Sequence, residues 1–405
     1  MRISFQQMTN AGVRELLLRQ ADVQKTQLQL ATQKRVLKPS DDPVAATAIT
    51  FLKAEIEQLE QFNRNSDAAL SNNQLEETAL GTVTNILFRI QELSVSAGNG
   101  VYTGSQLEAI KIELQERFDE VLGQANTQDA KGDFVFAGSI VKSKPYTIDA
   151  LGNVVYNGDQ NQRNLRISSG ASVAISDAGF DVFSNVKNGN GTFYTTADIA
   201  NAGSGVITRG GYNGASQFLA EPYDVTFALN GLGQLEYTVT GRNSATVEAG
   251  PALYQDGSDI NFQGVQIKVS GSPQAGDSFA VEPSQSEDVF TTIQGMINAL
   301  DTFVESDKGR ADLRNVLEST QATLERHIDN IDGVRAKVGA RLNAIDTEYG
   351  SNLSLLVTSK SSLSDVEDLD VVEASTRLSE QLIVLEAAQA SFVRVRDLNL
   401  FNFLR

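Results

Sequence analysis

The sequence contains no cysteine, no tryptophan and only one histidine among its 405 residues. Without cysteine the chain can form no disulfide, no thiolate metal site and no cysteine nucleophile. A single histidine also excludes an HExxH zinc site, which needs two, and allows a Ser-His-Asp triad on paper only. That histidine, His327, lies beside Leu324 and Ile328 in a helical pattern, so we expect it on a helix surface or at an interface.

Basic residues are scarce relative to acidic ones. The chain has 33 Lys and Arg against 51 Asp and Glu, which gives a formal net charge of −18. The largest basic cluster, Lys131 with Lys142 and Lys144, is interrupted by Asp133. Because the long-range field of a polyanion repels phosphate groups, we expect no nucleic-acid partner and no attraction to anionic membranes.

Long apolar runs are missing as well. No stretch approaches the roughly 18 apolar residues that mark a membrane-spanning helix. The first residues, MRISFQQMTNAGVRELL, have neither an apolar central region nor a small-residue cleavage site, so they do not resemble a Sec signal peptide. We therefore expect no membrane insertion, and either a cytoplasmic location or export by a route that uses no such signal.

Both ends of the sequence show a long helical period. At the N-terminal end the pattern covers residues 9–37 and stops at the run Lys-Pro-Ser-Asp-Asp-Pro of residues 38–43. Pro39 disfavours helix at the residue before it, Ser40, Asp41 or Asp42 can cap the next helix, and Pro43 suits a first turn. A second helix is predicted from Val44 towards Ala97, and a third over residues 107–125.

Helical period returns at residues 289–304 and 313–356, and again at the C-terminal end of the chain. Helices of this length need partners along their sides, because helix propensity alone is marginal in water. We expect the two helical arms to pair with each other as an antiparallel bundle.

Most of the 32 glycines lie between the two helical arms, where the pattern changes to short alternating runs and turns. Two β-hairpins are predicted there, one joining residues 146–148 to 154–156 and one joining 223–229 to 235–240. Further strands are predicted at 165–167, 173–175, 265–269 and 278–281. The glycine-rich stretch 185–214 is expected to be loop or weak edge strand.

No segment of the sequence gives a strong signal for a metal site or for catalysis. The acidic segment 364–373 does not match the spacing of an EF-hand loop, so we interpret it as an acidic first turn of a helix. The carboxylates of a carbohydrate-cleaving enzyme could be drawn from Asp159, Asp177, Asp181 and Asp224, but nothing in their spacing selects them. We predict no catalytic residue, no cofactor and no metal site.

Five long stretches carry a family resemblance. The run QLATQKRVLKPSDDPVAAT resembles the first helix-loop-helix of bacterial flagellins and of their junction proteins. The others are similar to the flagellar hook-filament junction proteins, the hook-associated protein three family: GDFVFAGSIVKSKPYTIDALGNVVYNGD, GVQIKVSGSPQAGDSFAVEPSQSEDVFTTI, RAKVGARLNAID and LSDVEDLDVVEASTRLSEQLIVLEAAQASFVRVRDLNLFNFL. Flagellin, the filament subunit, remains the alternative, although its loop usually reads closer to SAxDDAAG and it lacks the FVFAG and AGDSF segments.

The resemblance implies a structural subunit of the short ring that joins hook to filament in the extracellular flagellum. It implies self-association in that ring, contacts with the adjacent hook-associated protein and with flagellin, export by the flagellar type III apparatus, and a small chaperone on the C-terminal end before export. A less favoured hypothesis is a secreted protein that binds or cleaves carbohydrate through its β domain.

The predicted fold is α+β and multidomain, an elongated antiparallel α-helical bundle formed by the two ends with a central, mainly β domain inserted. The predicted parts are an N-terminal assembly arm (1–43), a paired helical bundle (44–132 with 287–363), the β domain (133–286) and a C-terminal assembly arm (364–405).

Apolar stripes at both ends of the chain would not be needed by solvated tails. We therefore predict that they contact neighbouring subunits and the chaperone. The residues of this predicted interface are Ile3, Phe5, Val13, Leu17, Leu28, Leu378, Leu382, Leu385, Phe392, Leu398, Phe401 and Phe403.

Overall fold

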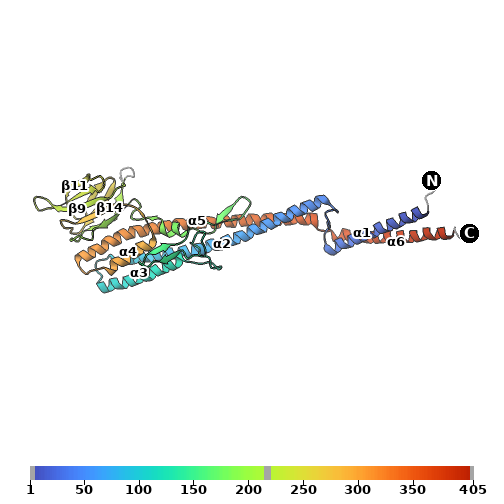
Figure 1. Cartoon of the computed structure of the whole chain (residues 1–405), viewed down its shortest axis with the longest axis horizontal. Coiled ribbons are helices and arrows are strands. Elements are labelled where there is room, and N and C mark those ends of the chain that lie inside the picture. The colour runs from blue at the N-terminus through green and yellow to red at the C-terminus, as the bar shows by residue number, and fades with distance from the viewer. Residues whose placement is uncertain (1–4, 214–219, 402–405) are drawn as a thin grey trace. The chain divides into compact units, whose positions relative to one another are not determined.

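The computed structural model describes residues 5–213 and 220–401. The chain divides into two compact units, which we call the terminal unit (Met1–Arg64 with Glu348–Arg405) and the central unit (Asn65–Thr347). Helices α2 (Pro43–Ala97) and α5 (Asp307–Glu367) each contribute to both units. The predicted combination of helical arms and a central β domain is confirmed (Figure 1).

The predicted start of the second helix is also confirmed. Helix α2 begins at Pro43, where the missing backbone N–H costs no helical hydrogen bond. Asp42 is its cap, because its Oδ1 accepts the N–H of Ala45 at 3.0 Å. The remaining helices are α1 (Phe5–Thr32), α3 (Gly104–Ala125), α4 (Val289–Asp301) and α6 (Val371–Phe401), and residues Phe180–Ser184 form a short π-helix.

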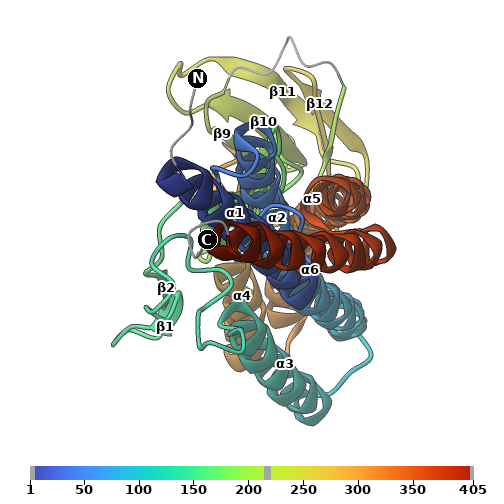
Figure 2. The same ribbon diagram turned by 90° about the vertical axis from the view of Figure 1, so that its right-hand side faces the viewer.

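Helices α1 and α6 of the terminal unit lie side by side in both views (Figures 1 and 2). Near the end of α1, Thr26 Oγ1 donates to Gln381 Oε1 at 2.8 Å. Near its start, the ring of Phe392 covers Gly12 so closely that a β-carbon there would lie 2.8 Å from a ring carbon. Since the later residue of α1 meets the earlier residue of α6, the pair is antiparallel, and Gly12 provides the room for the aromatic ring.

Helices α2, α3, α4 and α5 share one hydrophobic core in the central unit. Along α2 and α5 the contacts run in opposite directions: Glu77 pairs with Arg335 at 2.8 Å, and the carbonyl of Gly100 accepts from Arg310 at 2.9 Å. The two helices are therefore antiparallel, as predicted. Fully buried side chains such as Leu80 belong to the core that the two helices share.

An aromatic cluster closes one part of this core. Phe290 of α4 is buried, and its ring centroid lies 5.9 Å from that of Phe118 on α3 and 5.0 Å from that of Tyr146. Phe183 of the π-helix lies 6.4 Å from the same ring. Aromatic pairs in such geometry contribute beyond their buried area, so the cluster ties the base of the inserted segment to α3 and α4.

The inserted segment of the central unit is built from antiparallel strands. Five form one sheet in the order β11-β10-β9-β14-β6, and β12-β13-β7 form a second, with β8 also paired to β13. Buried residues of both sheets belong to one hydrophobic cluster, so the sheets pack face to face. Three further two-stranded pairs are β1-β2, β3-β4 and β5-β15.

Both predicted hairpins are present. Strands β1 (Tyr146–Ile148) and β2 (Val154–Tyr156) pair with Tyr146 opposite Tyr156. Strands β9 (Tyr223–Leu229) and β10 (Leu235–Gly241) pair with Leu235 opposite Leu229. The other strands expected from the sequence are β3 (Asn164–Arg166), β4 (Ser172–Ala174), β13 (Val265–Ser270) and β14 (Ser278–Pro283).

The described part of the stretch 185–214 is mostly loop, as expected, with four short strands. It holds β5 (Val186–Lys187), β6 (Phe193–Ala197), β7 (Val206–Ile207) and β8 (Gly211–Tyr212), and β6 is an edge of the five-stranded sheet, in line with the expected edge strand. The strands that sequence reasoning did not find elsewhere are β11 (Val247–Leu253), β12 (Asp259–Phe262) and β15 (Ser286–Glu287).

Of the two positions predicted for His327, the helix surface is wrong, and the side chain lies instead at an interface between helices α5 and α4. Its side chain is fully buried in the central unit, and its Nε2 lies 3.3 Å from Thr292 Oγ1 on α4. Helix α4 covers the face of α5 on which His327 lies, so the side chain is not exposed to solvent. Burial disfavours the charged imidazolium and lowers the pKa of His327 to about 3.

This burial predicts a pH dependence of stability. The ordinary pKa of the side chain is 6.5, so below that pH the unfolded chain binds a proton that the folded chain does not. The contribution of His327 to the free energy of unfolding should therefore fall by about 1.4 kcal/mol per pH unit as the pH drops from 6.5 towards 3. Urea unfolding between pH 6.5 and 5 checks this, because the difference in slope between the unchanged chain and His327→Leu isolates the contribution of His327 from those of the other titrating groups. Equal slopes in the two proteins would contradict the assignment, since the chain has no other histidine.

Candidate functional site

One candidate surface is the side of α1 that α6 does not cover. Thr26 and Gln29 are buried and bond to α6, through Gln381 and Arg377 respectively. The predicted interface residues Leu17 and Leu28 lie on another side of the helix and remain 59% and 57% exposed. Predicted residue Val13 is exposed as well. A helix with one covered face and a second, exposed apolar face is typical of a contact surface.

On α6 the predicted residues fall into two groups. Leu378, Leu385 and Phe392 are half-buried, and Phe392 packs on Gly12 of α1, so this group serves contacts within the chain. Leu382 is exposed. The structure thus separates residues that the sequence pattern had placed on a single stripe.

The other predicted interface residues cannot be placed. Ile3 and Phe403 lie outside the described residues. Phe5, Leu398 and Phe401 belong to the described backbone of α1 and α6, but their side chains lie outside the described part of the structure.

Exposed apolar side chains of the terminal unit extend beyond the predicted set. The run Leu-Ile-Val-Leu of residues 382–385 could have signalled this, because a helix that is apolar all round needs burial on every side. The additional exposed residues are Met8, Leu18, Val44, Phe51, Leu353, Leu355, Val357, Val371, Val372, Ile383, Val384 and Val393. Together with Val13, Leu17, Leu28 and Leu382 we call them the terminal apolar surface.

An ion-pair cluster joins the link between α1 and α2 to the end of α5. The carboxylate of Glu367, which is nearly buried, accepts from Lys34 at 2.5 Å and from Lys53 at 2.9 Å. The hydrogen bond from Lys34 lowers the pKa of Glu367, and the same contact raises the pKa of Lys34. Arg35 donates to the carbonyl of Val366 at 2.9 Å. The cluster ties the end of α1 to the end of α5 within the terminal unit.

The interpretation of residues 364–373 as an acidic first turn needs correction. Residues up to Glu367 end helix α5, so Asp365 and Glu367 do not belong to a helix start. Asp370 does act as a cap, because its Oδ1 accepts the N–H of Val372 at 2.9 Å at the start of α6. Sequence reasoning missed the break because the segment contains neither glycine nor proline.

The acids considered for carbohydrate chemistry are spread over separate contacts. Asp177 and Asp181 both line a cavity of about 730 Å³ in the central unit. Both oxygens of Asp177 lie 2.7 Å from Arg341 Nη2, so this carboxylate is already engaged by a guanidinium. Asp224 pairs with Arg242 at 2.6 Å, and Asp159 accepts from Asn161 at 3.0 Å.

A second buried carboxylate lies behind Asp177. Glu76 of α2 is fully buried, and its Oε1 accepts the N–H of Asp177 at 2.9 Å. Burial first and the charge of Asp177 second raise the pKa of Glu76 to about 8. Arg341 reaches Glu76 only at 3.7 Å, so one guanidinium joins α2, α5 and the inserted segment. This arrangement is a structural tie between helices, and the raised pKa of Glu76 favours its neutral form.

Over residues 5–213 and 220–401, no group of three or more His, Asp or Glu side chains is placed to bind a metal ion. In the same part of the chain, no helix combines the length and the apolar character needed to cross a bilayer.

Two family profiles match the sequence. Residues 3–140 match the bacterial flagellin N-terminal helical region, and residues 196–283 match the D2-like domain of flagellar hook-associated protein 1.

Similar proteins are found both by sequence and by structure. The crystal structure of the flagellar junction protein FlgL from Legionella pneumophila is 33% identical, with a TM-score of 0.72 over 79% of this chain and 99% of that one. Flagellar hook-associated protein 3 of Escherichia coli is 24% identical over 99% of both chains. Flagellar hook-associated protein 3 of Salmonella typhimurium is 30% identical over 46% of this chain, and that match spans 58% of the relative's length.

Proposed function

The chain belongs to the family of flagellar hook-filament junction proteins, hook-associated protein 3, and from that premise we propose that its terminal helices build the junction by self-association in a ring. The observation that carries this proposal is the terminal apolar surface. A single copy leaves aliphatic side chains such as Leu17 and Leu28 more than half exposed on a helix whose other face is already covered.

Repeated contacts between different surfaces of identical subunits produce rings or helical tubes. Helices α1 and α6 offer two such surfaces, because Leu28 lies on one helix and Leu382 on the other, and both are exposed. Burying aliphatic side chains of this size stabilises an interface by about 1.5–3 kcal/mol each. The terminal helices are therefore the parts of the chain that contacts with neighbouring subunits would stabilise most.

The ring so formed joins two different neighbours, an adjacent hook-associated protein on one side and flagellin on the other. The junction role is supported over the filament role by the 33% identity with a junction protein across 99% of that protein's length, and by the match of residues 196–283 to a hook-associated protein domain. The proposed role is structural and includes no catalytic step.

Before assembly the same apolar surface has to be kept from aggregating. We propose that a type III export chaperone covers the α6 part of it in the cytoplasm, and that the chain then leaves unfolded through the flagellar export apparatus without a Sec signal. Leu382 and Ile383, which are exposed on α6, are the positions at which a chaperone groove would bind first.

The test uses a strain that lacks its own junction protein. Full-length chain is expected to restore filaments and swimming, whereas chain lacking residues 376–405 is expected to restore neither, because α1 then loses its partner helix. Electron microscopy of hooks and a motility assay measure the result, and hydrogen exchange of the purified truncated chain should show a central unit as protected as in the full chain. Failure of the full-length chain would contradict the junction role, and success of the truncated chain would contradict the role of α6.

A further inference from the structure

A second cavity in the central unit has an apolar lining and no role in the contacts described above. Its volume is about 650 Å³, and it lies between the end of β6, the end of α4 and the first turns of α5. Phe303, Leu313 and Val316 supply apolar side chains to its wall. A cavity of this size and character is large enough to take apolar side chains from a protein segment.

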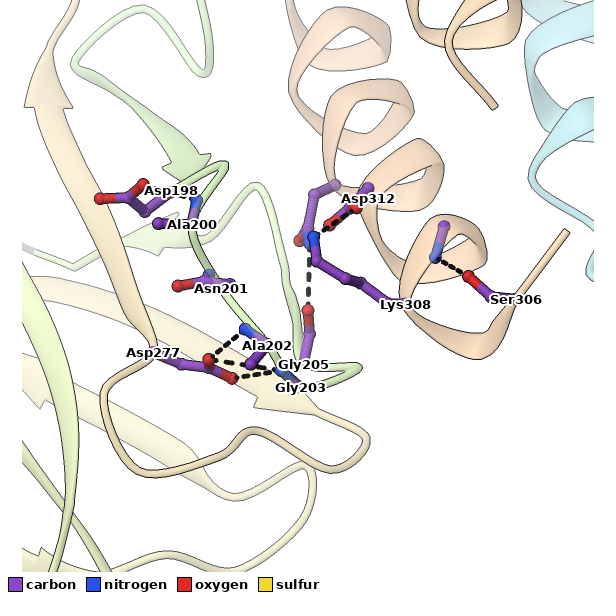
Figure 3. Close-up of polar contacts among 12 residues, drawn as sticks. Asp198, Ala200, Asn201, Ala202, Gly203, Gly205, Asp277, Ser306, Lys308 and Asp312 are labelled. Atoms are coloured by element: carbon purple, nitrogen blue, oxygen red, sulfur yellow. Dashed lines mark hydrogen bonds and ion pairs between the residues drawn. The ribbon is translucent and has the colours of Figure 1, made fainter. Parts of the chain in front are cut away.

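The loop that forms one wall is firmly held, as Figure 3 shows. The buried carboxylate of Asp277 accepts the N–H of Ala202 at 2.7 Å and that of Gly203 at 3.2 Å. Asn201 exchanges two hydrogen bonds with the backbone of Ser278, at 2.7 Å and 2.9 Å. These bonds fix residues 198–203 against the five-stranded sheet.

The opposite wall is joined to the same loop by one amide. Asn315 of α5 is buried, and its Nδ2 donates to the carbonyl of Gly205 at 3.0 Å while its Oδ1 accepts the N–H of Ile207 at 2.8 Å. Because both walls are positioned by buried hydrogen bonds, the cavity exists before any partner arrives. A preformed cavity binds with a smaller entropic cost than one that must be ordered.

The mouth of the cavity is apolar and carries one unpaired acid. Ile199 is 93% exposed and Val304 is 64% exposed, although both belong to its lining. Lys308 pairs with Asp312 at 2.7 Å, so its charge is neutralised (Figure 3). Asp198 has no cationic partner among the described residues. The matching segment is therefore apolar with a free positive charge beside it.

The β1-β2 hairpin of this chain has that character. Leu151 at its turn is 86% exposed, and Ile148 is exposed on β1. The turn is rigid, because Asp149 Oδ1 accepts the N–H of Leu151 at 2.8 Å and that of Asn153 at 2.9 Å. Lys144, two residues before β1, has no acidic partner within the described part of the chain. In Figure 2 the hairpin lies well away from strands β9, β10, β11 and β12.

We infer that the cavity lined by Phe303, Leu313 and Val316 receives the β1-β2 hairpin of a second copy of this chain, with Leu151 inside the cavity and Lys144 near Asp198. The contact is heterologous, because hairpin and cavity are different surfaces of one subunit, and it therefore suits a ring. It rests on the proposed self-association and adds a contact in the central unit to those of the terminal helices. Opposite charges at the contact also offset part of the repulsion between two polyanionic chains.

Single cysteines test this contact cleanly, because the chain has none of its own. Leu151→Cys and Val316→Cys chains are produced together in the strain that lacks its junction protein, and hooks are treated with a short bis-maleimide. Docking gives the two thiols a high effective concentration, so at least about tenfold more cross-linked dimer is expected than with either variant alone. The matched control pairs Val316→Cys with Leu232→Cys, which is 85% exposed on the β9-β10 turn.

The outcomes separate the two proposals. If both variants restore filaments but the dimer yield equals that of the Leu232→Cys control, the hairpin contact is refuted and the junction role stands. If the unmodified full-length chain restores no filaments, the junction role itself fails.

Charge reversal gives a second measurement that does not depend on cysteine placement. Asp198→Lys alone is expected to reduce the number of filaments about fivefold, and the added change Lys144→Asp to restore it. Both residues are exposed, but Asp198 Oδ1 also accepts the N–H of Ala200 at 2.9 Å, so Asp198→Asn with the same melting curve is the control for the loss of that bond. A double variant as poor as Asp198→Lys would overturn the pairing.

Discussion

Replacing Leu17 and Leu28 of α1 by Asp is expected to abolish incorporation at the junction without changing the thermal unfolding of the purified monomer. Both side chains are more than half exposed in the single chain, so little burial is lost there. In the assembled ring each leucine would contribute about 1.5–3 kcal/mol, so the pair accounts for a loss of about 100-fold or more in assembly affinity. A buried, unpaired carboxylate adds a further penalty.

The measurements are the number of filaments per cell and the melting curve of the monomer. The matched control adds the same two charges at Gln20 and Gln27, which are exposed polar residues of the same helix. This control should assemble normally. Normal filaments with Leu17→Asp and Leu28→Asp, or a melting curve shifted by the double change, would show that these leucines do not form a subunit contact.

The largest loss of monomer stability is expected from Phe290→Ala in the central unit. Phe290 is buried within the aromatic cluster that includes Phe118, Tyr146 and Phe183. Removing the ring deletes buried area and leaves a cavity among α3, α4 and the inserted segment. The expected cost is about 3–5 kcal/mol in the free energy of unfolding of this unit.

Urea unfolding followed by circular dichroism measures this cost, and hydrogen exchange assigns it to the central unit. The chain offers a matched control, because Phe51 on α2 is 69% exposed. Phe51→Ala should therefore change monomer stability by no more than about 0.5 kcal/mol. Equal losses from the two substitutions would mean that burial of Phe290 does not dominate the stability of this core.

Local sequence rules predicted those elements that local physics decides. The start of α2 follows from Asp42 and Pro43, and the turn of the β1-β2 hairpin follows from Gly152 and Asn153 between alternating strands. Strand β11 escaped the same rules because Gly250 and Pro251 interrupt its pattern. As an edge strand of the five-stranded sheet it tolerates proline, which leaves one fewer backbone donor to pair.

Burial of polar groups could not be predicted from the sequence. His327 and Glu76 occupy positions in helical patterns where either a surface or a buried site is compatible with the neighbours in sequence. Their burial depends on which element covers them: α4 lies over His327, and the inserted segment lies over Glu76. The cavity beside β6 has the same origin, because its walls come from residues more than 100 positions apart, as the bond between Asn315 and Gly205 shows.

The sequence by itself determined that both ends of the chain form long helices with more apolar surface than one pairing can bury, and that family membership could be expected. Only the tertiary structure decided which face of each helix is used within the chain. On α1, Thr26 and Gln29 face α6 while the more apolar stripe with Leu17 and Leu28 stays exposed. Helical periodicity cannot choose between two apolar faces, because it records how often apolar residues recur and not which partner covers them.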